Sequence, residues 1–211
     1  MPVKLHSTIQ AIAQKMQQWM LLNFDNNITN ALQDTQFQKT LPIAIACEEV
    51  AYKILLWIDH YSTDIVLARC VFDASGDFPG TTRTAFPKNR QAFENVYGLE
   101  FSNMLIEEGN KQRAMPQVDA PNGYPSANYL YKGYGIFQRD LQFVKQDKDF
   151  FFKKEWHDIN TCLDRLIKEL KNYAKTVDSL HEIIVKYNGT GPKAEQYALN
   201  VESYMNAMKE A

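Results

Sequence analysis

Apolar residues recur at helical spacing along most of the chain. Near its start, Ser7 and Gln10 form the pattern of a capping box, in which a hydroxyl and a side-chain amide satisfy free backbone N–H groups at a helix N-terminus. The apolar residues that follow are spaced three or four apart: Ile9, Ile12, Ala13, Met16 and Trp19. This spacing predicts a first helix that ends at about residue 22.

Pro42 can open a second helix, because the first helical position needs no backbone N–H. The residues after it are apolar on most of the helix circumference as far as about His60, which is typical of a central helix. Ser62 or Thr63 is a suitable N-cap for a third, shorter helix that must end before Gly76.

The last third of the chain predicts three more helices. The first covers residues 159–173, with an apolar stripe formed by Ile159, Leu163, Leu166, Ile167, Leu170 and Tyr173. Ser179 with Glu182 forms a second capping box, which opens the next helix. Asn188 and the following glycines end that helix, and Pro192 begins the last one.

Residues 77–89 and 115–135 are rich in proline, glycine and asparagine around aromatic residues, which is typical of loops. A short helix fits between these two stretches near 101–108, and Asp140 can cap another short segment. The alternation of apolar and polar residues over 129–137 allows one hairpin.

The whole pattern predicts a mainly α fold with elaborated central loops and at most a small β-hairpin. We expect residues 1–211 to form a single domain, with 1–40 as a helical extension packed on it.

Charge and composition narrow the classes of function. The 23 basic side chains nearly balance the 25 acidic ones, so a nucleic-acid partner has no electrostatic support. No run reaches the roughly eighteen apolar residues of a membrane span, and the N-terminus lacks a signal-peptide pattern. The sequence therefore predicts synthesis in the cytoplasm, without a transmembrane segment. We expect neither a metal nor a cofactor.

The chain has three cysteines, and each lies in an apolar run typical of a helix: Cys47, Cys70 and Cys162. We expect them to be buried free thiols; the alternative is a disulfide between Cys47 and Cys70.

Glu49 is the first candidate for chemistry. On a helical wheel it shares a narrow sector with Ile45 and Tyr52, so its carboxyl group is expected to be desolvated. Desolvation disfavours the charged form and raises the pKa, as a general acid requires. The alternative is that Glu49 extends to solvent or pairs with a lysine such as Lys53.

Asp73 and Asp77 flank a glycine turn in the segment FDASGDF. Glycoside hydrolysis commonly uses two carboxyl groups, one as the acid and one as the base or nucleophile, so an acidic loop facing Glu49 would suit that reaction. The alternative is that Asp77 only organises the turn and that Asp73 lies at an exposed helix end.

Three segments in order resemble motifs of goose-type lysozymes and soluble lytic transglycosylases. They are IACEEVAY, with Glu49 in the place of the catalytic glutamate, GYGIFQ at 133–138, and KYNGTGPKAEQYALNV at 186–201. The resemblance implies a lysozyme-like fold, with Tyr187 and Asn188 beside the acid and Gln138 in a glycan groove. Two features depart from the family pattern. Val50 follows Glu49 where the family has serine or threonine, and Gly133 lies 84 positions after Glu49, which is a long spacing. A second alignment places Asp73 at the catalytic position.

The segments LARCVFDASGD, RTAFPKN and YKGYGIFQRDLQ are also similar to a bacterial and phage group that acts on peptidoglycan. The resemblance implies cleavage of the β-1,4 bond between N-acetylmuramic acid and N-acetylglucosamine, at the cell wall, by a muramidase or a lytic transglycosylase. The expected substrate contacts are Tyr134, Phe137, Gln138, Tyr187, Asn188 and Tyr197. Since no signal peptide is evident, an export machine or a lysis pore would deliver the protein. The alternative function is a non-catalytic module of a phage or secretion apparatus that binds cell-wall glycan, and a purely helical interaction protein is a third possibility.

Overall fold

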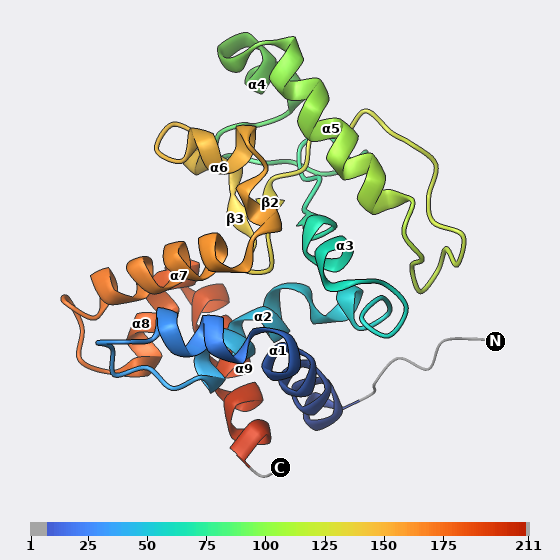
Figure 1. Ribbon diagram of the computed structural model, residues 1–211. Coiled ribbons are helices and arrows are strands. Elements are labelled where there is room, and N and C mark those ends of the chain that lie inside the picture. The colour runs from blue at the N-terminus through green and yellow to red at the C-terminus, as the bar shows by residue number, and fades with distance from the viewer. Residues whose placement is uncertain (1–7, 210–211) are drawn as a thin grey trace. The chain divides into compact units, whose positions relative to one another are not determined.

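The computed structural model describes residues 8–209, and they are mainly helical with one small antiparallel sheet (Figure 1). The mainly α fold with a small sheet is therefore confirmed. The chain divides into two compact units: the ends of the chain, up to Leu55 and from Ile159, form unit 1, and Leu56–Asp158 form unit 2. The expectation of a single domain stays a prediction.

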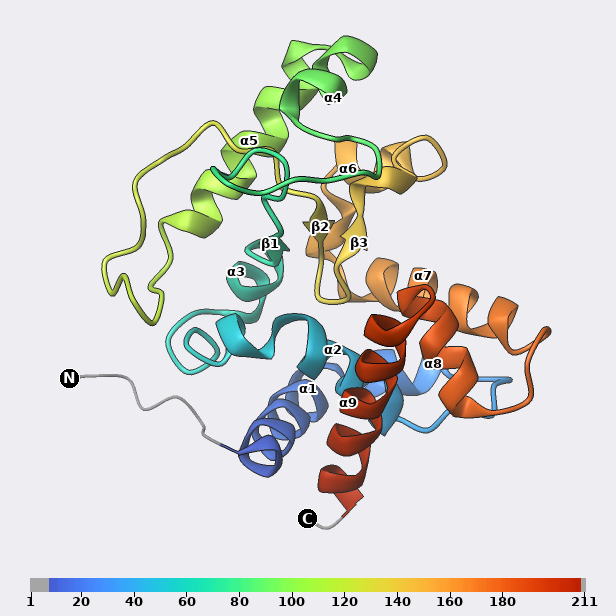
Figure 2. The same cartoon turned by 180° about the vertical axis from the view of Figure 1, so that it is seen from behind.

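Unit 1 is a bundle of helices from both ends of the chain. Helix α9 packs against α1, α2 and α8, while α7 packs against α1 and α8 (Figure 2). The bounds are α1 (Ile9–Ala31), α2 (Thr40–Ile54), α7 (Ile159–Tyr173), α8 (Leu180–Asn188) and α9 (Pro192–Lys209). Packing of this kind lets each helix bury its apolar stripe, which supplies most of the stability of helices in proteins.

Helix α1 is longer than its sequence pattern predicts. Thr8 is its N-cap and accepts a hydrogen bond from the Ala11 amide at 3.2 Å; Ser7, the expected cap, lies outside the described residues. Phe24 has non-helical backbone angles, which marks a kink close to the predicted end. Apolar spacing then resumes with the buried Ile28, and this burial carries the helix on to Ala31.

Helix α2 ends at Ile54, so the prediction that it reaches His60 is wrong. The apolar pattern does continue past Ile54, but those residues pack in unit 2. Trp57 is fully buried there, and its indole N–H donates a hydrogen bond to the Pro116 carbonyl at 2.7 Å. Trp57 thus belongs to a different core from that of α2, whereas Asp59 and His60 are exposed.

Several local start signals were predicted correctly, but Pro42 does not open α2: the helix begins at Thr40, and Pro42 is its third residue. The capping box of Ser179 and Glu182 is present at the start of α8, and α9 begins at Pro192, as predicted. In unit 2, Ser62 precedes helix α3 (Thr63–Ala68) as expected. These signals depend on neighbours in sequence, which explains why the sequence shows them.

Unit 2 surrounds its small sheet with short helices. Besides α3, it contains α4 (Arg90–Tyr97), α5 (Leu99–Arg113), α6 (Lys148–Phe152) and the 3₁₀ helices η1 (Leu141–Phe143) and η2 (Glu155–His157). Helix α4 was not predicted, and α5 is longer than expected. Asn89 caps α4 by accepting a hydrogen bond from the Ala92 amide at 2.9 Å, and Gly98, with φ of 86°, turns the chain into α5.

The sheet has the order β1 (Val71–Phe72), β2 (Gly133–Tyr134) and β3 (Arg139–Asp140), all antiparallel. Phe72 pairs with Gly133, and Gly133 pairs with Asp140. The predicted hairpin is present but lies later in the chain, because Gly135 and Gln138 adopt the positive φ angles of its turn, 79° and 48°. The sheet brings the end of α3 next to the GYGIFQ segment.

All three cysteines are buried free thiols, which confirms that interpretation over a Cys47–Cys70 bridge. Across residues 8–209, no helix has both the length and the apolar character needed to cross a bilayer.

Candidate active site

Helices α2 and α9 hold the side chain of Glu49 between them within unit 1. The phenol of Tyr197 on α9 donates a hydrogen bond to Oε1 of Glu49 at 2.7 Å. Glu49 is half-buried and Tyr197 is buried. Burial raises the pKa of Tyr197 well above its ordinary value, so its hydroxyl keeps the proton that it donates.

The carboxyl group of Glu49 is desolvated. Burial raises its pKa from 4.5 to about 7; the Tyr197 hydrogen bond opposes this rise, and the charge of Glu48 adds to it. A carboxyl group with a pKa near neutrality can hold and release a proton under ordinary conditions, as a general acid must. The desolvation that the sequence predicts is therefore present, while the catalytic role of Glu49 stays a prediction.

Glu48, the adjacent residue, is held by a different partner on the same helix. Its Oε1 accepts a hydrogen bond from the side-chain amide of Asn200 at 2.9 Å. Tyr197 and Asn200 are three residues apart and lie on one face of α9, so this face supplies one donor to each of the two neighbouring carboxyl groups. Glu48 is therefore a matched control for experiments on Glu49.

The residues of the third motif lie at the end of α8. The ring of Tyr187 is half-buried, and its centroid is 6.3 Å from that of Tyr197. Asn188 is exposed at the last position of the helix. The structure thus links Glu49 to Tyr197 directly and to Tyr187 through the Tyr197 ring. From the sequence, Tyr197 was expected to contact substrate, and its hydrogen bond to Glu49 was not predicted.

Asp73 belongs to unit 2 and directly follows β1. Its backbone is left-handed, with φ of 63°, and its Oδ1 accepts a hydrogen bond from the Ser75 amide at 2.9 Å. The Arg83 guanidinium lies 3.5 Å from Oδ2, and 46% of the Asp73 side chain is exposed. This exposed, charge-paired carboxylate suits the role of a base or nucleophile better than that of a proton donor.

Asp77 is engaged on both oxygens. Its Oδ2 pairs with the ammonium group of Lys132, whose side chain is fully buried, and its Oδ1 accepts a hydrogen bond from the Arg90 amide at 2.8 Å. These contacts join the loop after β1 to the segment before β2 and to the start of α4. A structural role explains them fully, so a catalytic role for Asp77 stays a prediction without support from this geometry.

Gln138 closes the hairpin that contains the GYGIFQ motif. Its side-chain amide donates a hydrogen bond to the Gly135 carbonyl at 2.7 Å. A Cβ atom at Gly133 would meet the oxygen at the movable end of the Gln138 side chain, so a larger residue there would displace Gln138 from this hydrogen bond. The two ends of the motif are therefore in contact across the turn.

Tyr134 and Phe137 lie in the core of unit 2. Tyr134 is fully buried, and its ring meets those of Phe151 and Trp156 at centroid distances of 5.3 Å and 4.9 Å. Phe137 is only 6% exposed. Packing accounts for both rings, so the glycan contacts expected of them stay predictions.

The predicted site residues therefore divide between the two units. Glu49, Tyr187, Asn188 and Tyr197 belong to unit 1, whereas Asp73, Asp77, Tyr134, Phe137 and Gln138 belong to unit 2. Each set has its own internal contacts, as described above.

A second buried acid, Glu108, was not identified from the sequence. It is 1% exposed, and its Oε1 accepts hydrogen bonds from Lys111 at 2.8 Å and Lys154 at 2.7 Å. Burial alone would raise its pKa, but the two ammonium groups lower it. Glu108 follows Phe101 and Leu105 on the apolar stripe of α5, and that spacing was the available signal.

Within the described part of the chain, no group of three or more histidine, cysteine, aspartate or glutamate side chains is arranged to hold a metal ion. No protein-family model, curated protein or solved structure matches the chain. The lysozyme-like resemblance thus rests on the sequence motifs.

Proposed function

We propose that this protein cleaves the glycan strand of peptidoglycan at the β-1,4 bond between N-acetylmuramic acid and N-acetylglucosamine, with Glu49 as the general acid. The observation that supports the proposal is the carboxyl group of Glu49, whose pKa is raised to about 7 by burial and which Tyr197 holds in place. The three motifs, in their family order, supply the substrate class.

In this reaction the protonated Glu49 gives its proton to the glycosidic oxygen as the bond to the anomeric carbon breaks. The leaving sugar departs as an alcohol, and the other sugar passes through an oxocarbenium-like state. Attack by water yields a reducing end, whereas attack by the same sugar's 6-hydroxyl yields an anhydro end. A hydrolase also needs a carboxylate that activates water. The sequence candidate for that role, Asp73, belongs to unit 2, where its exposed carboxylate pairs with Arg83.

Asp73 is also the alternative acid. The second alignment assumed that Asp73 ends a helix; in the structure α3 ends earlier, at Ala68, and Asp73 follows β1 next to the Gly133–Gln138 hairpin. Aspartate reaches one methylene less far than glutamate, and only a comparison of variants separates the two assignments.

The test is the loss of turbidity of purified bacterial cell wall. Glu49→Gln keeps the shape of the side chain but cannot donate a proton from a carboxyl group, so we expect the rate to fall by about 100-fold or more. Glu48→Gln, on the neighbouring residue, is the matched control and should stay near the wild-type rate. Equal rates for wild type and Glu49→Gln would remove Glu49 from the mechanism, and loss of activity only in Asp73→Asn would assign the acid to Asp73.

Mass analysis of the released muropeptides identifies the reaction class. Reducing ends indicate a muramidase, and anhydro ends indicate a lytic transglycosylase. If the wild-type protein co-sediments with cell wall but releases no fragments, the function is that of a glycan-binding module. Failure both to bind and to cleave would overturn the substrate class itself.

A further inference from the structure

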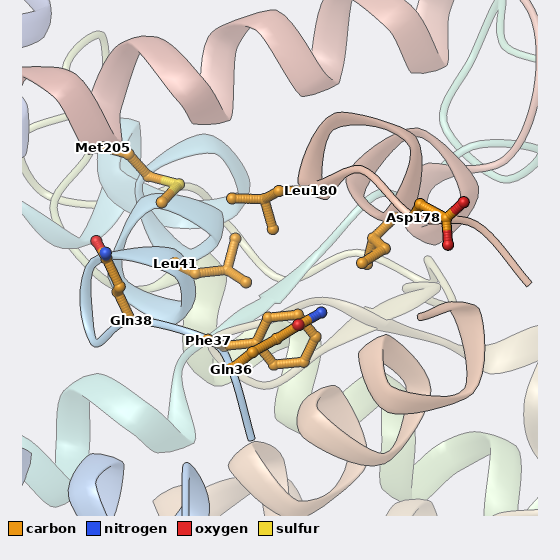
Figure 3. Close-up of a pocket in the computed structure, with 8 residues that line it drawn as sticks. Gln36, Phe37, Gln38, Leu41, Asp178, Leu180 and Met205 are labelled. Atoms are coloured by element: carbon orange, nitrogen blue, oxygen red, sulfur yellow. The ribbon is translucent and has the colours of Figure 1, made fainter. Parts of the chain in front are cut away.

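Unit 1 contains a pocket at the junction of three segments. It has a volume of about 310 Å³ (Figure 3). The segments are the chain entering α2, the loop that leads into α8, and the inner face of α9. The lining residues are Gln36, Phe37, Gln38, Leu41, Asp178, Leu180, Ile183 and Met205. None of the nine predicted site residues lines this pocket, so it is a separate feature.

The floor of the pocket is apolar. Leu41, Ile183 and Met205 are 0%, 1% and 5% exposed, and Figure 3 shows the side chains of Leu41, Leu180 and Met205 directed toward a common centre. Phe37 adds a half-buried ring to one wall. A closed apolar floor of this kind favours an apolar group over a sugar, whose hydroxyls would find no hydrogen-bond partners there.

The mouth of the pocket is polar and carries one charge. Gln36, Gln38 and Asp178 are exposed, and none of the lining side chains is basic. Asp178 comes directly before the N-cap of α8, but Ser179 and Glu182 already satisfy that helix end with their capping box. Within residues 8–209, no hydrogen bond or ion pair engages the Asp178 carboxylate, so it is available to a ligand.

We propose that this pocket binds a small amphipathic amine: one apolar group with a single primary ammonium at its end. The apolar group would lie against Phe37 and Leu180, the apolar lining residues that are partly exposed, and the ammonium would meet Asp178 at the mouth. A cavity of about 150 Å³ accommodates a benzene molecule. The pocket has about twice that volume, which fits one aromatic ring with a short alkyl chain.

The experiment uses 4-phenylbutylamine as the probe and follows the Met205 methyl group by NMR in the full chain. Two further ligands keep the apolar part and change only the end group: 4-phenylbutan-1-ol is neutral and 4-phenylbutyrate is an anion. We expect a saturable shift with the amine and a dissociation constant on the order of 1 mM. The alcohol should bind more weakly, and the acid most weakly.

Two variants test the assignment of residues. Asp178→Asn should weaken amine binding by about two- to fivefold, the range of one exposed ion pair, and leave the alcohol unaffected. Asp164→Asn, an exposed acid on α7 outside the pocket, is the matched control. Leu180→Trp should obstruct the pocket and abolish binding of all three ligands, with the fold checked by circular dichroism.

Three outcomes overturn the proposal. They are the absence of a saturable shift at Met205, equal affinity for all three end groups, and amine binding that Asp178→Asn leaves unchanged. Because Asp178 is exposed, its variant should fold even if Leu180→Trp does not, and the result with Asp178→Asn alone is decisive.

Discussion

The phenol oxygen of Tyr197 lies 2.7 Å from Oε1 of Glu49, so α9 holds the acid that α2 carries. This contact joins two residues that are 148 positions apart in the sequence. It opposes the main effect of burial: removal from water favours the neutral acid, whereas the phenol stabilises the carboxylate. The pKa of about 7 at Glu49 is the balance of these effects, and Tyr197 sets part of it.

Tyr197→Phe should therefore raise the pKa of Glu49 above about 7, because it removes a donor that stabilises the charged form. A carbon-13 NMR titration of the Glu49 carboxyl group measures this shift directly. If Glu49 is the general acid, the alkaline limb of the pH–rate profile should move to higher pH by the same amount. Tyr204→Phe removes another hydroxyl from α9 and is the control; an unchanged Glu49 titration in Tyr197→Phe would contradict the prediction.

Glu49 should also make stability depend on pH. Its pKa is higher in the folded state than in the unfolded chain, so the folded protein holds the proton more tightly. The resulting stabilisation is fully present below pH 4.5 and is lost as pH rises through about 7, an effect of about 3 kcal/mol. Urea unfolding at several pH values measures it. Glu49→Gln should flatten this dependence, and a variant with the wild-type slope would show that Glu49 is not its source.

The sequence predicted those features of the fold that depend on neighbouring residues. The capping box at Ser179, the helix start after Ser62 and the helix start at Pro192 are of this kind. Helix α4 follows the loop-like stretch 77–89 and was missed because it is short and Phe93 is its one buried residue. The end of α2 was misplaced because apolar residues continue beyond Ile54 but pack in the other unit.

Only part of the candidate site could be predicted. The position of Glu49 on an apolar stripe indicated a desolvated acid, and its raised pKa agrees. Its partner Tyr197 depends on how α2 and α9 pack, and helical periodicity does not specify that packing. The pairing of Asp77 with Lys132 is likewise set by the sheet, which brings together residues that are 55 positions apart.

The ion pair of Asp77 and Lys132 should be important for stability. The Lys132 side chain is fully buried, so Asp77→Asn would leave an ammonium group out of water without its counter-charge. Breaking a buried pair in this way costs about 3–5 kcal/mol. Asp73→Asn is the control, because its pair with Arg83 is half-exposed and should cost less than about 1 kcal/mol. Urea unfolding compares them, and similar losses in both variants would contradict the buried-pair argument.

Glu108 should give a pH dependence of opposite sign to that of Glu49. Lys111 and Lys154 lower its pKa, so its stabilisation is present above pH 4.5 and is lost as pH falls through the lower, folded-state value. Glu108→Gln should remove this loss in acid and cost about 1.5–3 kcal/mol at neutral pH, because the buried side chain loses its charge-assisted hydrogen bonds from Lys111 and Lys154. Glu107→Gln is the control, since that side chain is 65% exposed. A neutral-pH cost no larger than that of the control would refute the prediction.

His181 should stabilise unit 1 only when it is charged. Its Nε2 lies 2.9 Å from Glu195 and its Nδ1 lies 3.2 Å from Glu202, so it connects α8 to α9. These two carboxylates raise its pKa above 6.5, so the stabilisation is fully present below pH 6.5 and is lost as pH rises through the raised value. Because 34% of the side chain is exposed, His181→Gln should cost less than about 1 kcal/mol at pH 5, and added salt should shrink the difference further. Thermal unfolding at pH 5 and pH 9 checks this: equal effects of the substitution at both pH values would show that the charge of His181 contributes nothing to the contact.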